Sequence, residues 1–178
     1  MTAANKCKIV VFSLTALCCL FMSFAASEQT ILASSTAKHV FSDPKTQDVF
    51  KLTIRGTSLL KADAIFEIVS STGKVLYHET FKAYWLSNEL ETEGFSQKQE
   101  EEYIRKRVHE FFNEKHFLKP AVSLKDKTDS DYSDMTVWNE LRANKAAIGF
   151  QYLLSYENDR KIAYSKRLGK VVVYWSCC

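Results

Sequence analysis

Six short segments with the features of β-strands constrain the fold of this chain more than any other feature, and apolar and polar side chains alternate in three of them, residues 49–55, 62–70 and 148–156. An alternation of period two is typical of a β-strand with one buried side, and short turns between neighbouring segments favour antiparallel pairing. The segments form two groups of three, which comprise residues 49–55, 62–70 and 74–81, and residues 148–156, 161–165 and 171–176.

Helical patterns separate the two groups of strands. Ser96 and Gln99 form a capping-box signature, and apolar residues then recur at helical spacing until about His116, before Pro120. The apolar stripe of this helix consists of Ile104, Val108, Phe111 and Phe112. A second, shorter helix is predicted to start at Asp134 and to carry Val137, Trp138 and Leu141.

The predicted order of elements is βββ-α-α-βββ, with the helices segregated between two runs of strands. Such segregation is typical of α+β proteins. We expect one antiparallel sheet or two small ones, with one long amphipathic helix packed on a face. Residues 48–178 then form a single domain. Residues 26–47 are rich in Ser, Thr and Ala without a sustained period, which predicts a flexible tether.

The first 27 residues match an export signal. Lys6 and Lys8 precede an uncharged, mostly apolar run, and the small residues Ser23 and Ala25 provide a cleavage site. This pattern predicts that residues 1–25 are a signal peptide and that the protein is periplasmic or secreted.

Two alternatives to this cleavage remain open. A lipid-modified Cys19 would hold the protein on a membrane surface as a lipoprotein, although the apolar run continues beyond that residue. An uncleaved anchor over residues 9–26 would have 18 residues, which is the short limit for a helix that spans a bilayer.

Removal of the signal peptide leaves a nearly neutral protein. The chain has 24 basic and 21 acidic residues, and the signal peptide removes two lysines, so the net charge falls to +1. This balance argues against a nucleic-acid partner and against an anionic membrane surface. The predicted partner is another protein or an envelope component, and no cofactor is predicted.

Cys177 and Cys178 are the only cysteines that remain after cleavage. Two adjacent cysteines close no loop of the domain, and they can bridge each other only in a strained ring. We expect monomers that carry a labile pair, with a minor disulfide-linked dimer. A redox role and an unreactive pair both remain open.

Three stretches carry a resemblance to a family of proteins. They are FKLTIRGTSLL from residue 50, FEIVSSTGKVLYHETF from residue 66, and KIAYSKRLGKVVVYWSCC at the end of the chain. In these stretches the chain resembles an uncharacterised family of small secreted or lipid-anchored bacterial proteins. The resemblance implies export and a shared fold, and it implies no activity.

The acidic segment KDKTDSDYSD is the best candidate for a cation site. Asp129, Asp131 and Glu140 occupy positions one, three and twelve of a calcium-binding EF-hand loop. Position six of such a loop is a glycine, and here it is Asp134. An acidic, solvated loop that ends in a helix cap accounts for the same residues, so no metal site is predicted. His109 and His116 are seven residues apart, which is the wrong spacing for a zinc helix.

Four aromatic residues near strand ends are candidates for a contact surface. They are Tyr84, Trp85, Tyr174 and Trp175. The alternative is that these rings fill the core of a small domain. No motif for catalysis or phosphate binding occurs, so we expect an exported, non-enzymatic binding domain. The alternative function is a small extracytoplasmic hydrolase or thiol enzyme whose catalytic residues assemble only in three dimensions.

Overall fold

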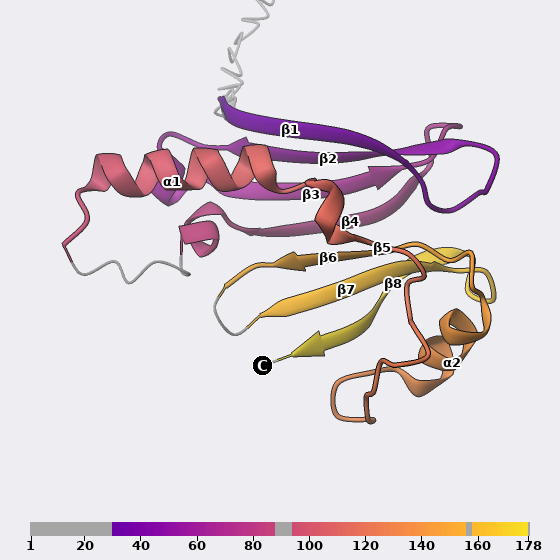
Figure 1. Ribbon diagram of the computed structural model, residues 1–178. Coiled ribbons are helices and arrows are strands. Elements are labelled where there is room, and N and C mark those ends of the chain that lie inside the picture. Colours follow the sequence, from indigo (N-terminus) through magenta and orange to yellow (C-terminus); the bar gives the residue numbers. More distant parts are fainter. Residues whose placement is uncertain (1–29, 88–93, 156–157, 178) are drawn as a thin grey trace, which may run out of the picture.

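The protein contains two antiparallel sheets of four strands each, which form two layers (Figure 1). The structure is a computed structural model that describes residues 30–87, 94–155 and 158–177. The first sheet comprises β1 (Ile31–Val40), β2 (Gln47–Arg55), β3 (Asp63–Val69) and β4 (Val75–Lys82). The second comprises β5 (Phe117–Leu118), β6 (Gly149–Leu153), β7 (Asp159–Ser165) and β8 (Lys170–Cys177). In each sheet the strands follow chain order, which confirms an α+β protein with antiparallel sheets.

Aromatic rings from both sheets meet in one core. The ring of Phe150 in β6 lies 5.5 Å from Phe50 in β2 and 5.7 Å from Phe66 in β3, measured between centroids. Phe111 and Phe112 enter the same cluster from the segment after the first helix. The sheets therefore pack face to face around these rings, as in a β-sandwich.

The prediction of a flexible tether over residues 26–47 is wrong for most of that segment. Ile31–Val40 forms strand β1, which pairs antiparallel with β2 along its whole length. Its inward positions include Ala33 and Ala37, which pack against the core but carry little apolar surface. Because these side chains are small, the alternation of hydropathy is too weak to distinguish the strand from a tether.

The observed order of elements also differs from the predicted one. The first group has four strands, and the short strand β5 separates the two helices. Strand β7 begins at Asp159, in the segment that was expected to be a turn, and β8 continues to Cys177.

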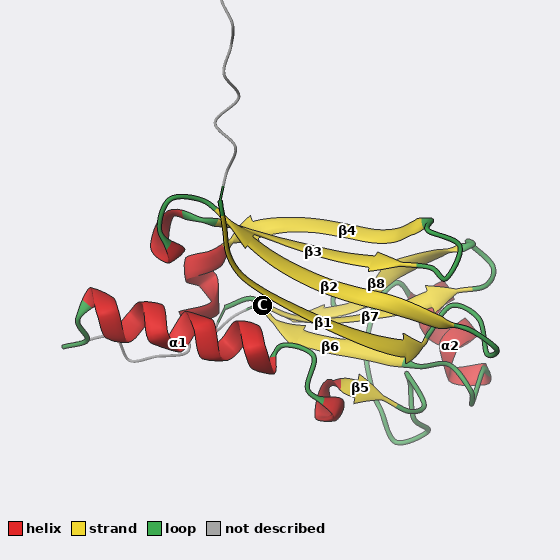
Figure 2. Cartoon of the chain, turned by 90° about the horizontal axis from the view of Figure 1, so that it is seen from above, coloured by secondary structure: helices red, strands yellow, loops and turns green. Residues whose placement is uncertain are grey.

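Helix α1 (Gln97–Glu110) has the predicted capping box, in which Ser96 and Gln99 exchange hydrogen bonds. The helix ends six residues earlier than expected, because Phe111 and Phe112 turn into the core. Only Ile104 and Val108 are buried within the helix itself. It lies beside the edge strand β1 and against the 3₁₀ turns η1 (Leu59–Lys61) and η2 (Ala83–Ser87) (Figure 2).

Helix α2 (Met135–Ala143) starts as predicted, with the Asp134 carboxylate accepting two backbone N–H groups. Its buried residues Val137, Trp138 and Leu141 form a second, smaller core with β7 and β8. This core covers the face of the second sheet that points away from the first. Within the described ranges, no helix is both long and apolar enough to cross a membrane.

Candidate functional site

The acidic loop before α2 and the last strand form one open surface. The residues that line a hollow of about 370 Å³ there, which we call the C-terminal hollow, are Lys127, Thr128, Asp129, Tyr132, Trp175 and Cys177. A second hollow of about 380 Å³ shares Tyr132 and Trp175 with it. The structure thus brings together residues that lie more than 40 positions apart in the chain.

A backbone hydrogen bond joins the two segments. The Ser176 N–H group donates to the Tyr132 carbonyl oxygen at 2.9 Å, so part of the loop lies against the outer edge of β8. The Tyr132 side chain is 41% exposed, and Val173 on the same strand is 37% exposed. This bond places an exposed tyrosine beside the end of the last strand.

A register shift in β8 decides which of its aromatic rings reaches the surface. Ile162 pairs with Val173 and Lys161 pairs with Trp175, so Tyr174 is an extra residue without a direct partner. Residues that are directly opposite share a face of the sheet, and Lys161 Nζ lies 4.6 Å from the centroid of the Trp175 ring. Trp175 is therefore half-buried and held by a cation from the neighbouring strand.

Tyr174 cannot take part in the contact surface, because its side chain is buried. Its hydroxyl donates to the Ala121 carbonyl oxygen at 2.6 Å, and its ring packs on Trp138. A Cβ at Gly149 would lie 2.9 Å from that hydroxyl, so this position requires a glycine. Burial raises the pKa of the Tyr174 phenol above its usual range.

The other predicted aromatic pair lies in η2. Tyr84 is 41% exposed, and Trp85 stacks on Phe81 with 10° between the ring planes. No ring contact joins this pair to Trp175 in the part of the chain that the structure describes. The four predicted rings therefore divide into a buried Tyr174, a half-buried Trp175 and a separate pair in η2.

The acidic residues of the candidate cation loop make separate contacts. Asp129 Oδ1 accepts the Asp131 N–H at 3.0 Å, and Asp134 caps α2. Glu140 Oε2 accepts the Ser165 hydroxyl at 2.6 Å, so its carboxylate is directed toward β7. Burial opposes ionisation of Glu140, but hydrogen bonds from Ser165 and from backbone N–H groups lower its pKa overall. Among the described residues, no group of three or more potential ligands could hold a metal ion.

We expect calcium to leave the stability of the protein unchanged. A ligand that binds only the folded state raises the melting temperature by mass action, whereas separated carboxylates provide no such site. The measurement is a thermal melt with and without millimolar calcium, with magnesium as a control for general ionic effects. A calcium-specific rise in the melting temperature would contradict this expectation.

A polar cluster that was not predicted from the sequence lies between the two sheets. Glu79 Oε2 accepts hydrogen bonds from the hydroxyls of Tyr152 at 2.6 Å and Tyr77 at 3.1 Å. The two hydroxyls lie 2.8 Å apart, and the Arg160 guanidinium forms an ion pair with Glu79 Oε1. The cluster connects β4 in the first sheet with β6 and β7 in the second.

Burial and charge shift the acid–base properties of this cluster. Burial raises the pKa of Tyr77 to about 12 and raises the pKa of Tyr152 further, so both hydroxyls remain protonated at neutral pH. Burial disfavours the charge of Arg160, but the Glu79 carboxylate more than offsets this effect and raises its pKa. Both oxygens of Glu79 have partners, so the cluster is a clamp between sheets and presents no free general base.

One sequence signal could have revealed this cluster. Glu79 follows the alternation of β4, in which Tyr77 and Phe81 share its inward side. A charged residue at an inward strand position requires a buried partner. That partner, Arg160, lay in the segment predicted as a turn.

Comparisons with family models, with curated proteins and with solved structures returned no match. The resemblance to a family of small exported proteins therefore remains a prediction. The fold is a two-sheet α+β sandwich, and the C-terminal hollow lies at the end of its last strand.

Proposed function

We propose that this chain is an exported, non-enzymatic binding domain that contacts a partner protein through the C-terminal hollow. The single observation that carries the proposal is the placement of Tyr132 and Trp175 on one open surface. Tyrosine and tryptophan are the residues most enriched among those that dominate protein–protein binding energy. Lys127, Asp129 and Lys161 surround them with charges of both signs, as in the polar rim of an interface.

Export is part of this proposal and rests on the pattern of residues 1–25. These residues lie outside the described part of the chain, as do Cys19 and Cys178. Cys177, the last residue of β8, is partly exposed. We therefore retain the expectation of monomers with a minor disulfide-linked dimer through the terminal cysteines.

The proposal favours binding over catalysis because of how the polar groups are arranged. The carboxylate of Glu79, whose side chain is 15% exposed, is saturated by hydrogen bonds and an ion pair. The hollow at Trp175 is broad, and its lining combines rings, a thiol and charged groups. Such a surface fits contact with another protein.

Photo-crosslinking in the producing cells tests the proposal. A photoreactive amino acid at position 132 is expected to yield discrete protein adducts, separated by electrophoresis and identified by mass spectrometry. Trp175→Ala should reduce these adducts at least tenfold, because loss of such an anchor weakens binding by about 2 kcal/mol or more.

Tyr84 provides the matched control, since it is the same residue type with the same exposed fraction of 41%. The photoreactive amino acid at position 84 should give none of the adducts obtained at position 132. Identical adducts from both positions, or adducts that persist in Trp175→Ala, would count against a binding role for the C-terminal hollow.

A further inference from the structure

The outer edge of β1 is blocked at both ends and open in its middle. At one end, Arg105 Nη1 of α1 donates to the Leu32 carbonyl oxygen at 2.8 Å. At the other end, the His39 ring stacks on Phe117 with a centroid distance of 3.4 Å, and His39 Nε2 lies 3.3 Å from Glu114. Proteins commonly protect free strand edges with charges, proline or covering segments. Of the residues between these blocks, 33–38, only Lys38 at the His39 end is charged, and residues 33–37 contain no charge and no proline.

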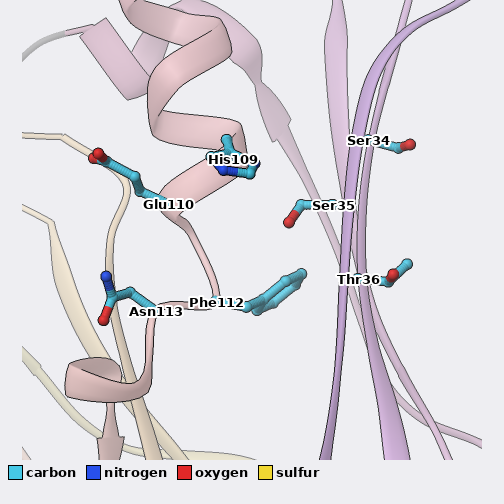
Figure 3. A pocket seen from close by; sticks show the side chains of 7 residues that line it. All are labelled: Ser34, Ser35, Thr36, His109, Glu110, Phe112 and Asn113. Carbon is cyan, nitrogen blue, oxygen red and sulfur yellow. The ribbon is translucent and has the colours of Figure 1, made fainter.

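A hollow of about 430 Å³ lies between this stretch and the end of α1 (Figure 3). Its lining residues are Ser34, Ser35, Thr36, His109, Glu110, Phe112 and Asn113. Figure 3 shows the Ser35 side chain directed toward α1, whereas the side chains of Ser34 and Thr36 point away from it. Ser34 and Thr36 therefore line the hollow with their main chain, and Phe112 provides an apolar wall.

Main-chain groups at this edge are available for hydrogen bonding. In an antiparallel pair, alternate residues direct their N–H and C=O groups away from the partner strand. The Gly56 N–H donates to the Thr30 carbonyl oxygen, so the even-numbered residues of β2 direct their main-chain groups toward β1. Beyond the irregularity at Leu32, these residues pair with Ala33, Ser35 and Ala37, which leaves the main-chain groups of Ser34 and Thr36 directed outward. No main-chain group from a helix or loop of the described ranges bonds to Ser34 or Thr36.

We propose that this edge accepts an extended segment of a partner polypeptide, which adds to the first sheet as a further strand. Only another peptide backbone matches donors and acceptors that repeat along a strand. The segment would place one side chain in the hollow beside Ser35 and Phe112. This surface shares no residue with the C-terminal hollow, and the proposal does not depend on it.

A negative charge at the rim of the hollow indicates which side chain the bound segment carries. Glu110 is exposed at the rim of the hollow, and its carboxylate has no hydrogen-bond or ion-pair partner among the described residues. It is also the last residue of α1, where the helix dipole favours a positive charge. The segment is therefore expected to carry a lysine or arginine at the position that faces Glu110.

A second copy of this chain fits the edge less well than a short segment. If two copies of the chain paired their β1 strands around a two-fold axis, each strand would lie alongside all ten residues of the other. Helix α1 lies beside the Leu32 half of β1 (Figure 2), in the space that the copy's strand requires. An isolated extended segment of about three residues, roughly 10 Å long, avoids this overlap.

Selection of peptides by the intact chain tests the inference. The probe is a phage-displayed library of linear nine-residue peptides, and the selected sequences are remade with a fluorescent label for anisotropy titrations. His109→Trp fills the hollow, and we expect it to weaken binding at least tenfold. Lys106→Trp makes the same kind of change at an exposed position of α1 that does not line the hollow, and it should leave affinity unchanged.

Two further readouts connect binding to this edge. Glu110→Gln should weaken the selected peptides several-fold, and these peptides should be enriched in lysine or arginine. Hydrogen exchange at the amides of Ser34 and Thr36 should slow when peptide is bound. Thermal melts of each variant show whether the fold is retained, and Glu110→Gln keeps the test valid if His109→Trp lowers stability.

Several outcomes would overturn the inference. A library that yields no binder, equal binding by the two tryptophan variants, or protection confined to other strands would each exclude a peptide at β1. Concentration-dependent dimerisation with slowed exchange at Ser34 and Thr36 would assign the edge to a second copy instead.

Discussion

Glu79→Ala is expected to lower the free energy of unfolding by about 3–5 kcal/mol, because it leaves Arg160 as an uncompensated charge between the sheets. The side chains of Glu79 and Arg160 are only 15% and 27% exposed, so water replaces the lost partner poorly. The Tyr77 and Tyr152 hydroxyls lose their acceptor at the same time. Urea unfolding followed by circular dichroism measures the change.

Glu67→Ala is the matched control for this prediction. Glu67 lies on the solvent-facing side of β3, and its Oε1 lies 3.2 Å from Nδ1 of the exposed His78. Exposed pairs of this kind contribute at most about 1 kcal/mol to the free energy of unfolding. The double change Glu79→Leu with Arg160→Leu should recover much of the loss, because it removes both buried charges. Equal, small effects of Glu79→Ala and Glu67→Ala would show that the clamp contributes little.

Phe111→Ala is expected to lower the free energy of unfolding by about 3–5 kcal/mol, as other large-to-small changes in a core do. Phe111 is 4% exposed, and its ring lies 5.5 Å from Phe66 in the first sheet and 5.9 Å from Phe150 in the second. Its loss would leave a cavity between the sheets that neither backbone can fill. The same unfolding experiment measures this cost.

Phe95→Ala is the control, because it removes the same ring from a position that is 45% exposed. Its effect should remain within about 0.5 kcal/mol. A Phe111→Ala protein with unchanged stability would contradict the placement of this ring in the core.

These predictions assign different roles to the interior and to the surface of the protein. The interior between the sheets holds both the aromatic cluster and the Glu79 clamp, which together fix how the sheets pack. The surfaces proposed for recognition lie outside that interior, at Trp175 and along the β1 edge. Variants at Trp175 or His109 should therefore reduce binding while leaving the fold intact.

The sequence by itself determined the elements whose signals are local. Alternation predicted the strands around Leu52 and Phe66, and the Ser96 and Asp134 caps predicted where both helices begin. These signals are readable because hydrogen bonds and side-chain periodicity within a few residues produce them.

Only the tertiary structure decided which residues meet. Strand β1 forms because β2 offers it a complete pairing edge, although its small inward side chains carry almost no periodic signal. Two partners of Glu79, Tyr152 in β6 and Arg160 in β7, lie more than 70 residues away in the chain. The bulge at Tyr174 likewise depends on the register between β8 and β7. Contacts across such distances depend on how the sheets pack, and no spacing within one segment encodes them.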